Sequence, residues 1–227
     1  MSLEADAPLM DYLRTIDTPT VSNAIERLKI RPQGSGFAPV DIRYLFPEFG
    51  PMCAHAVTAQ VETVTESHRK TEEAFVALFE AVERSPKPAV VVVQELGHYS
   101  QCAAHCGEVM ATIFKRLGAE GLVSDCAVRD IAEVRKLGFR YFARGAVASH
   151  ASFRIVSVNV PVQILGFVVQ PQDILHGDEN GLIQVPRESF GGLKEAIEMV
   201  RSTERRLMEF VRSPNFTANQ LRGRFLE

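Results

Sequence analysis

Residues 89–143, AVVVVQELGHYSQCAAHCGEVMATIFKRLGAEGLVSDCAVRDIAEVRKLGFRYFA, hold the clearest structural pattern in the chain. They open with a β-branched run, Ala89 to Val93, which is typical of a strand buried on both faces. Apolar residues then recur at helical spacing over 108–117 and 131–137, and a glycine follows each segment. Short apolar runs at 121–124 and 140–143 complete the order strand–helix–strand–helix–strand. This order predicts parallel strands joined by right-handed crossovers.

The flanking sequence predicts further elements around this parallel core. Helices are expected over 9–13, 21–28, 70–82 and 187–211, an irregular connection over 31–51, and strands over 53–65 and in several short pieces over 153–185. No linker long enough to divide the chain is visible. We therefore expect a single α/β domain over residues 1–227, with a parallel-strand core, a β-rich layer and a C-terminal helix.

Composition excludes several classes of protein. The 25 Lys and Arg residues against 28 Asp and Glu residues give a net charge of −3, without the basic stripe of a nucleic-acid binder. No apolar run approaches the roughly 18 residues of a membrane-spanning helix. No secretory signal is seen at the N-terminus. The four cysteines form no CxxC pair or disulfide framework, so the simplest expectation is a cytoplasmic protein that binds neither nucleic acid nor membrane.

A glycine and a glutamate open the helix expected over 108–117. The first N–H groups of a helix have no internal partner and carry partial positive charge. Gly107, Glu108, Val109 and Met110 therefore offer a cradle for a carboxylate or phosphate. Spacing alone favours a plainer interpretation, in which Gly107 is a loop glycine and Glu108 complements the helix dipole.

An adjacent arginine and aspartate follow the next strand of the same sheet. Ligands bind open α/β sheets beyond the carboxyl ends of the strands. There, Arg129 can fork onto a carboxylate or keto oxygen, and Asp130 can hold a hard divalent cation. The structural alternative has equal weight: Asp130 caps the next helix, and Arg129 is solvated or paired with Asp125.

Histidines and cysteines in the first loop raise the question of zinc. His98, Cys102, His105 and Cys106 all lie within nine residues, whereas structural zinc sites usually draw two pairs from separate segments. We therefore favour cysteines buried as small hydrophobes. Cys126 has no local histidine to activate it as a nucleophile.

Three segments together resemble one known family. They are TPTVSNAIERL at 18–28, CGEVMATIFKRLGAEGLVSDCAVRDIAEVRKLGFRYFARG at 106–145, and HGDENGLIQVP at 176–186. In this order and spacing they are similar to the RraA-like family, which includes the 4-hydroxy-4-methyl-2-oxoglutarate / 4-carboxy-4-hydroxy-2-oxoadipate aldolases. The resemblance implies a swivelling β/β/α fold that assembles as a homotrimer or homohexamer.

The resemblance also implies an activity: a class II, Mg²⁺- or Mn²⁺-dependent aldolase that releases pyruvate from a small oxo-acid and decarboxylates oxaloacetate. It implies that backbone N–H groups of Gly107 to Met110 hold the pyruvate carboxylate. Arg129 would bind the substrate, Asp130 would ligate the metal, and Glu108 would orient a water on it. A glutamate from a neighbouring subunit, for which Glu204 is the candidate, would assist.

Two departures and one alternative accompany the resemblance. Family members usually have glycine where this chain has Cys126, and the loop at 97–101 is idiosyncratic, so the part of the pocket beyond the pyruvate unit is expected to differ. Some relatives are non-catalytic regulators that bind and inhibit a ribonuclease. Those relatives lack the acidic metal ligand after the arginine, so the presence of Asp130 favours the enzyme.

Overall fold

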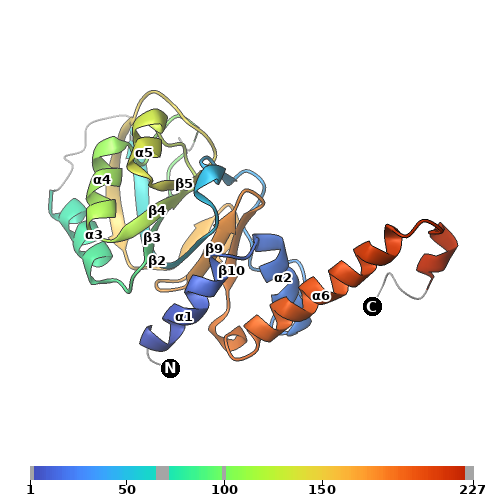
Figure 1. Ribbon diagram of the computed structural model, residues 1–227. Coiled ribbons are helices and arrows are strands. Elements are labelled where there is room, and N and C mark those ends of the chain that lie inside the picture. Colours follow the sequence, from blue (N-terminus) through green and yellow to red (C-terminus); the bar gives the residue numbers. More distant parts are fainter. Residues whose placement is uncertain (1–2, 65–71, 99–100, 223–227) are drawn as a thin grey trace.

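A mixed sheet with a parallel centre organises the molecule (Figure 1). The computed structural model describes residues 3–64, 72–98 and 101–222. The parallel strands, in spatial order, are β5 (Arg140–Ala143), β4 (Ala119–Ser124), β3 (Ala89–Glu95) and β2 (Met52–Val64). The antiparallel additions are β1 (Arg43–Tyr44) on β5, β6 (Ser152–Val158) and β9 (Ile174–Asp178) on β2, and β10 (Gly181–Val185) on β9. A separate hairpin pairs β7 (Val162–Ile164) with β8 (Phe167–Val169).

Three crossover helices cover the parallel strands: α3 (Glu72–Arg84), α4 (Glu108–Arg116) and α5 (Ile131–Leu137). Figure 1 shows them together beside β3 and β4. The β-branched residues of β3 are buried on both faces, as the continuous apolar run predicts. Phe114 of α4 and Val134 of α5 are fully buried in the same hydrophobic cluster. Each such side chain stabilises the fold by about 1.5–3 kcal/mol relative to exposure.

A second hydrophobic cluster lies beside β9 and β10. It is built by α1 (Leu3–Leu13), α2 (Thr18–Arg27) and the first half of α6 (Leu193–Val211). Beyond Val200 no described residue of α6 is buried. After the contacts of Arg201 with Asp17 and of Glu204 with Asn23, the helix projects away from the rest of the molecule and leads to the short 3₁₀ helix η3 (Ala218–Leu221) (Figure 1). No helix in the described part of the chain is long and apolar enough to cross a membrane.

The expected α/β fold with a parallel-strand core and a C-terminal helix is confirmed. The segment 31–51 is irregular apart from β1 and the 3₁₀ helix η1 (Pro47–Phe49). The expected helix over 187–211 is wrong at its start: a 3₁₀ turn, η2 (Arg187–Ser189), comes first, and Gly191 and Gly192 delay α6 to Leu193. Thr65 and residues 70–71, at the ends of two expected elements, lie outside the described residues. The single domain over 1–227 stays a prediction.

Candidate active site

Two loops at the carboxyl ends of β3 and β4 pair through their backbones and so build the site. Ala104 and Ala127 form an isolated parallel bridge, in which His105 N–H donates to the Ala127 carbonyl at 3.1 Å. One step further, Arg129 N–H donates to the Cys106 carbonyl at 3.0 Å. This pairing brings the start of α4 against the residues that precede α5.

The carboxylate of Asp130 joins these two loops at their ends. Its Oδ2 accepts a hydrogen bond from Glu108 N–H at 2.9 Å and lies 3.5 Å from Nε of Arg129. Asp130 adopts a left-handed backbone conformation (φ 58°), which Asp tolerates better than most residues. Its side chain makes no capping bond to its own helix, α5. The structural alternative is therefore wrong in part: Asp130 is the N-cap residue of α5 only through its backbone, while its side chain caps α4. The Arg129 side chain is 36% exposed and pairs with Asp130 rather than with Asp125.

The start of α4 keeps open hydrogen-bond donors. Asp130 occupies the N–H of Glu108, but among the described residues nothing accepts from the N–H groups of Val109 and Met110. The Glu108 side chain is exposed at the same helix start. The structure thus gathers Gly107 to Met110, Arg129 and Asp130, the residues named from the sequence, around one helix N-terminus.

Gly107 provides the space in which this arrangement fits. A Cβ atom at this position would lie 2.4 Å from Oδ2 of Asp130 and 2.9 Å from Nε of Arg129. The backbone of Gly107 is extended (φ −133°), a conformation open to any residue. Glycine is therefore required here for close approach and not for backbone freedom.

A cavity of about 310 Å³ adjoins the helix start, at the small end of the roughly 300–1,000 Å³ typical of ligand pockets. Gly107, Val109 and Arg129 contribute to its lining together with the rings of Phe75 and Phe153. A small acid with one substituent suits this volume better than a large cofactor.

Behind the cavity lies a buried polar network that the sequence analysis missed. Oε2 of Glu95 contacts Nε2 of His105 at 2.9 Å and accepts from the hydroxyl of Thr63 at 2.6 Å. Nδ1 of His105 contacts the Ser124 hydroxyl at 2.9 Å, and that oxygen also accepts from Cys126 N–H. The Ser124 proton is then free for Nδ1, which leaves His105 to donate from Nε2 to Glu95.

The four residues considered for zinc from the sequence, His98, Cys102, His105 and Cys106, do not form a common set of ligands in the structure. In the part of the chain that the structure describes, the one group of at least three metal-ligand side chains with ligand atoms within 4.8 Å of one another is Glu95, His105 and Cys126. Of the four residues weighed earlier, only His105 belongs to it. Cys106 is buried, as expected for a small hydrophobe, whereas Cys102 is exposed.

Two buried carboxyls in this region, those of Glu95 and Asp125, have pKa values shifted in opposite directions. Burial alone would raise the pKa of Glu95, but hydrogen bonds from His105, Thr63 and Gly97 lower it to about 2. Burial raises the pKa of Asp125 to about 6, although Glu95 N–H donates to it. Burial also raises the pKa of the Cys126 thiol, which argues against a nucleophilic role.

Glu95→Gln should destabilise the fold by about 3 kcal/mol at pH 7, because the folded-state pKa of Glu95 lies well below its unfolded value of 4.5. A carboxyl with a depressed folded-state pKa stabilises the protein above its unfolded pKa. We therefore expect the difference from wild type to shrink as the pH falls from about 4.5 towards 2. Urea unfolding at pH 7 and pH 3 measures this. The exposed pair of Glu62 and Arg154 supplies a control, since Glu62→Gln should cost under about 1 kcal/mol. Equal losses for Glu95→Gln at both pH values would contradict the assignment.

Cys126 and the 97–101 loop, the two expected departures from the family pattern, lie in different parts of the structure. Cys126 is buried with its Sγ 3.8 Å from Oε2 of Glu95, so it belongs to the polar network and does not line the cavity. In the 97–101 loop, Gly97 N–H donates to Oε1 of Glu95 at 2.7 Å. Tyr99 and Ser100 lie outside the described residues.

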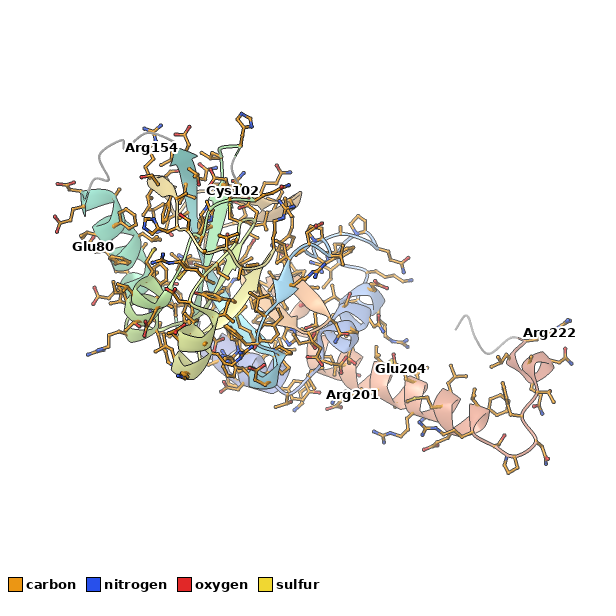
Figure 2. All side chains as sticks on the ribbon, turned by 90° about the horizontal axis from the view of Figure 1, so that it is seen from above. Glu80, Cys102, Arg154, Arg201, Glu204 and Arg222 are labelled. Atoms are coloured by element: carbon orange, nitrogen blue, oxygen red, sulfur yellow. The ribbon has the colours of Figure 1, made fainter. Side chains whose placement is uncertain are left out.

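Glu204 is not near this site within the chain. It lies on the projecting half of α6, well apart from Cys102 in the loop that precedes the site (Figure 2). Its described partner is Nδ2 of Asn23, at 3.4 Å. A role for Glu204 towards a neighbouring subunit stays a prediction.

A family model, RraA-like (Aldolase/RraA), matches residues 18–184. A protein of Halalkalibacterium halodurans, provisionally named 4-hydroxy-4-methyl-2-oxoglutarate aldolase, is 30% identical over 112 residues, which are 49% of this chain and 52% of that protein. An uncharacterized protein of Methanocaldococcus jannaschii is 28% identical over 124 residues, which are 54% of this chain and 60% of that protein. The chain thus spans about half to three fifths of the length of these two relatives.

Solved structures share the fold over nearly the whole chain. One, from Pseudomonas syringae pv. tomato, is 24% identical and gives a TM-score of 0.71 over 95% of this chain and 97% of that chain. Another, RraAS2 of Streptomyces coelicolor, is described as an unusual member of the RNase ES inhibitor RraA protein family. It is 25% identical and gives a TM-score of 0.62 over 91% of this chain and 96% of that chain.

Proposed function

Because the chain belongs to the RraA-like (Aldolase/RraA) family, we propose that it is a divalent-metal-dependent class II aldolase, which cleaves 4-hydroxy-2-oxo acids to pyruvate and decarboxylates oxaloacetate. One observation carries this proposal. Asp130 and Arg129 lie beside the open helix start of α4, so that a carboxylate, a guanidinium and free backbone N–H groups come together there. Of these residues, Arg129, Val109 and Met110 also line the adjoining cavity.

The residues present suit a hard divalent cation. Oδ2 of Asp130 is held by Glu108 N–H, whereas no described residue donates to Oδ1. Mg²⁺ takes oxygen ligands and usually keeps several waters, so a single carboxylate is enough once substrate oxygens join. Bound there, Mg²⁺ or Mn²⁺ would act as a Lewis acid on the keto oxygen.

Backbone and side-chain groups would bind the substrate carboxylate, stabilise the developing charge and transfer a proton. The N–H groups of Val109 and Met110 bind the substrate carboxylate at the positive end of the helix. Arg129 places its charge where an enolate oxygen develops. A water held by Glu108 takes the proton of the 4-hydroxyl group, the C3–C4 bond breaks, and the same water returns the proton to the methyl carbon of pyruvate.

The proposal includes a homotrimeric or homohexameric assembly in the cytoplasm. The projecting half of α6 supports an assembly, because it leaves Met208 and Val211 exposed on a helix with little contact to the rest of its own chain. Glu204 lies on this segment and would reach a neighbouring copy's site from it. The absence of a nucleic-acid partner also stays a prediction.

Pyruvate release from oxaloacetate and from 4-hydroxy-4-methyl-2-oxoglutarate tests the activity. We expect turnover with Mg²⁺ or Mn²⁺ and a fall to the background rate with EDTA, because the keto oxygen then lacks its Lewis acid. Restoring the metal should restore turnover. The similarity to RraAS2 supports a second candidate function, that of a regulator which binds and inhibits a ribonuclease. Tight binding to a ribonuclease without turnover of either acid would favour that function.

A further inference from the structure

We propose that His150 is a specificity-determining residue, whose imidazole binds the second carboxylate of a 4-hydroxy-2-oxo dicarboxylic acid in the cavity. This inference rests on the proposed function, in which the other polar groups of such an acid already have partners: the metal, Arg129, the start of α4 and the water held by Glu108. His150 lies outside the three segments that resemble the family, so its role is assigned from its position in the structure.

Backbone pairing at the carboxyl edge of the sheet brings His150 to the cavity. The loop after β5 joins the two loops that build the site, because Val128 and Ala146 form a second isolated parallel bridge. Further along this loop, the Ser149 carbonyl accepts a hydrogen bond from Ala104 N–H at 3.3 Å. His150 is the next residue and lines the cavity. Its place is therefore set by hydrogen bonds between loops.

His150 and Arg129 reach the cavity from different points of the loop after β3. Arg129 N–H is bonded to the Cys106 carbonyl, whereas Ser149 is bonded two residues earlier, at Ala104. The cavity is lined by both His150 and Arg129. A small acid with its oxo-acid end at Arg129 and the start of α4 can thus place its other end at His150.

The turn that carries His150 fixes its ring. Nδ1 of the imidazole contacts the carbonyl of Ala151, so this nitrogen carries a proton and donates it. Ala151 N–H in turn donates to the Ser149 hydroxyl at 3.0 Å, and Ala151 adopts a left-handed backbone conformation (φ 47°). This conformation is costly for a residue with a Cβ atom, and such strain is concentrated at functional sites. Nε2 is the ring nitrogen that the turn leaves for a ligand.

A carboxylate suits the Nε2 position. An approaching negative charge favours the protonated imidazole, which then donates from Nε2 while Nδ1 stays bonded to the carbonyl. The resulting hydrogen bond is charge-assisted and stronger than one between neutral groups. His150 is exposed, so water competes for the same carboxylate. We therefore expect a preference of about tenfold, at the low end for hydrogen bonds to charged groups.

Two pairs of acids isolate the second carboxylate. 2-Oxoglutarate and 2-oxopentanoate differ only in a carboxylate or methyl group at C4, and they lack the 4-hydroxyl group, so their dissociation constants with Mn²⁺ report binding without cleavage. 4-Hydroxy-2-oxoglutarate and 4-hydroxy-2-oxopentanoate are the reactive pair. We expect the wild-type protein to favour the dicarboxylate about tenfold in Kd, measured by calorimetry, and about tenfold in kcat/KM for pyruvate release.

Substitutions of His150 test whether this residue carries the preference. His150→Ala should lower both ratios about tenfold, while the affinity for oxalate, which resembles only the pyruvate end, stays within about twofold of wild type. His150→Arg returns a positive charge and should restore the preference for the dicarboxylate. Lys136→Ala is the control, because it removes an exposed positive charge near the end of α5 that lies away from the site. Solvent screens a charge at that distance, so neither ratio should change.

The outcomes separate the two proposals. A wild-type protein that does not distinguish the members of either pair, or ratios that His150→Ala leaves unchanged, would overturn the role of His150 and leave the aldolase intact. A lost preference that His150→Arg does not restore would also overturn it, because the charge at this position would then not be what the second carboxylate meets. No pyruvate from the hydroxy acids or from oxaloacetate would overturn the aldolase, whereas the dissociation constants of the unreactive pair would still decide the role of His150.

Discussion

Asp130→Asn lowers metal-stimulated pyruvate release by at least about a thousandfold while the protein stays folded, which is the expected result if this carboxylate holds the cation. The asparagine side chain keeps an oxygen to accept from Glu108 N–H and tolerates the left-handed backbone of this position. It removes only the charge and the strong oxygen ligand. Mn²⁺ affinity, measured by calorimetry or by the Mn²⁺ electron-spin signal, should fall in parallel with kcat/KM.

Asp130→Ala provides the matched comparison, because it removes the hydrogen bond as well as the charge. Loss of a cap costs about 1 kcal/mol, and alanine in a left-handed conformation costs roughly 1–2 kcal/mol more. We expect the alanine variant to be inactive and less stable in urea, and the asparagine variant to be inactive at nearly wild-type stability. Full turnover of either oxo-acid by Asp130→Asn would show that the metal is held elsewhere.

The parallel core could be predicted from the sequence because its signals are local. Val90 to Val92 form a continuous β-branched run, and Gly118 and Gly138 end the two crossover helices with positive φ. Since parallel strands bring their carboxyl ends to one edge, the meeting of Gly107 with Arg129 and Asp130 followed from the same pattern. The hydrogen bond by which Asp130 caps α4 could not be predicted in the same way. It depends on backbone pairing between two loops, and the side chains of those loops show no pattern that indicates this pairing.

The buried network was missed for a different reason. Its members Thr63, Glu95 and Ser124 come from three strands that are neighbours only in space, whereas a metal-ligand motif is recognised by its spacing along one segment of the chain. A usable signal was present: each of the three is a polar residue near the carboxyl end of an expected parallel strand. Polar residues that recur at that edge are expected to lie together even when no local motif joins them.

Gly107→Ala should reduce kcat/KM by at least about a hundredfold, because its methyl group would lie 2.4 Å from Oδ2 of Asp130 and the carboxylate must move. The extended backbone accepts alanine, so the loss cannot be ascribed to a forbidden conformation. The cost in stability should stay near 1 kcal/mol, the difference between glycine and alanine at a helix start. We expect weaker Mn²⁺ binding with an unchanged circular dichroism spectrum.

Gly191→Ala is the matched control for this substitution. Gly191 also precedes a helix, but a Cβ atom there meets nothing within 4 Å, and its φ is not positive. Its kcat/KM should remain within about twofold of wild type, because α6 begins well apart from α4 and α5 (Figure 1). The contrast between the two glycines tests whether activity depends on the close approach of Gly107 to Asp130 or on glycine at a helix start in general. Wild-type turnover by Gly107→Ala would mean that Asp130 can leave its observed position without consequence, and the carboxylate could then not be the group that fixes the cation.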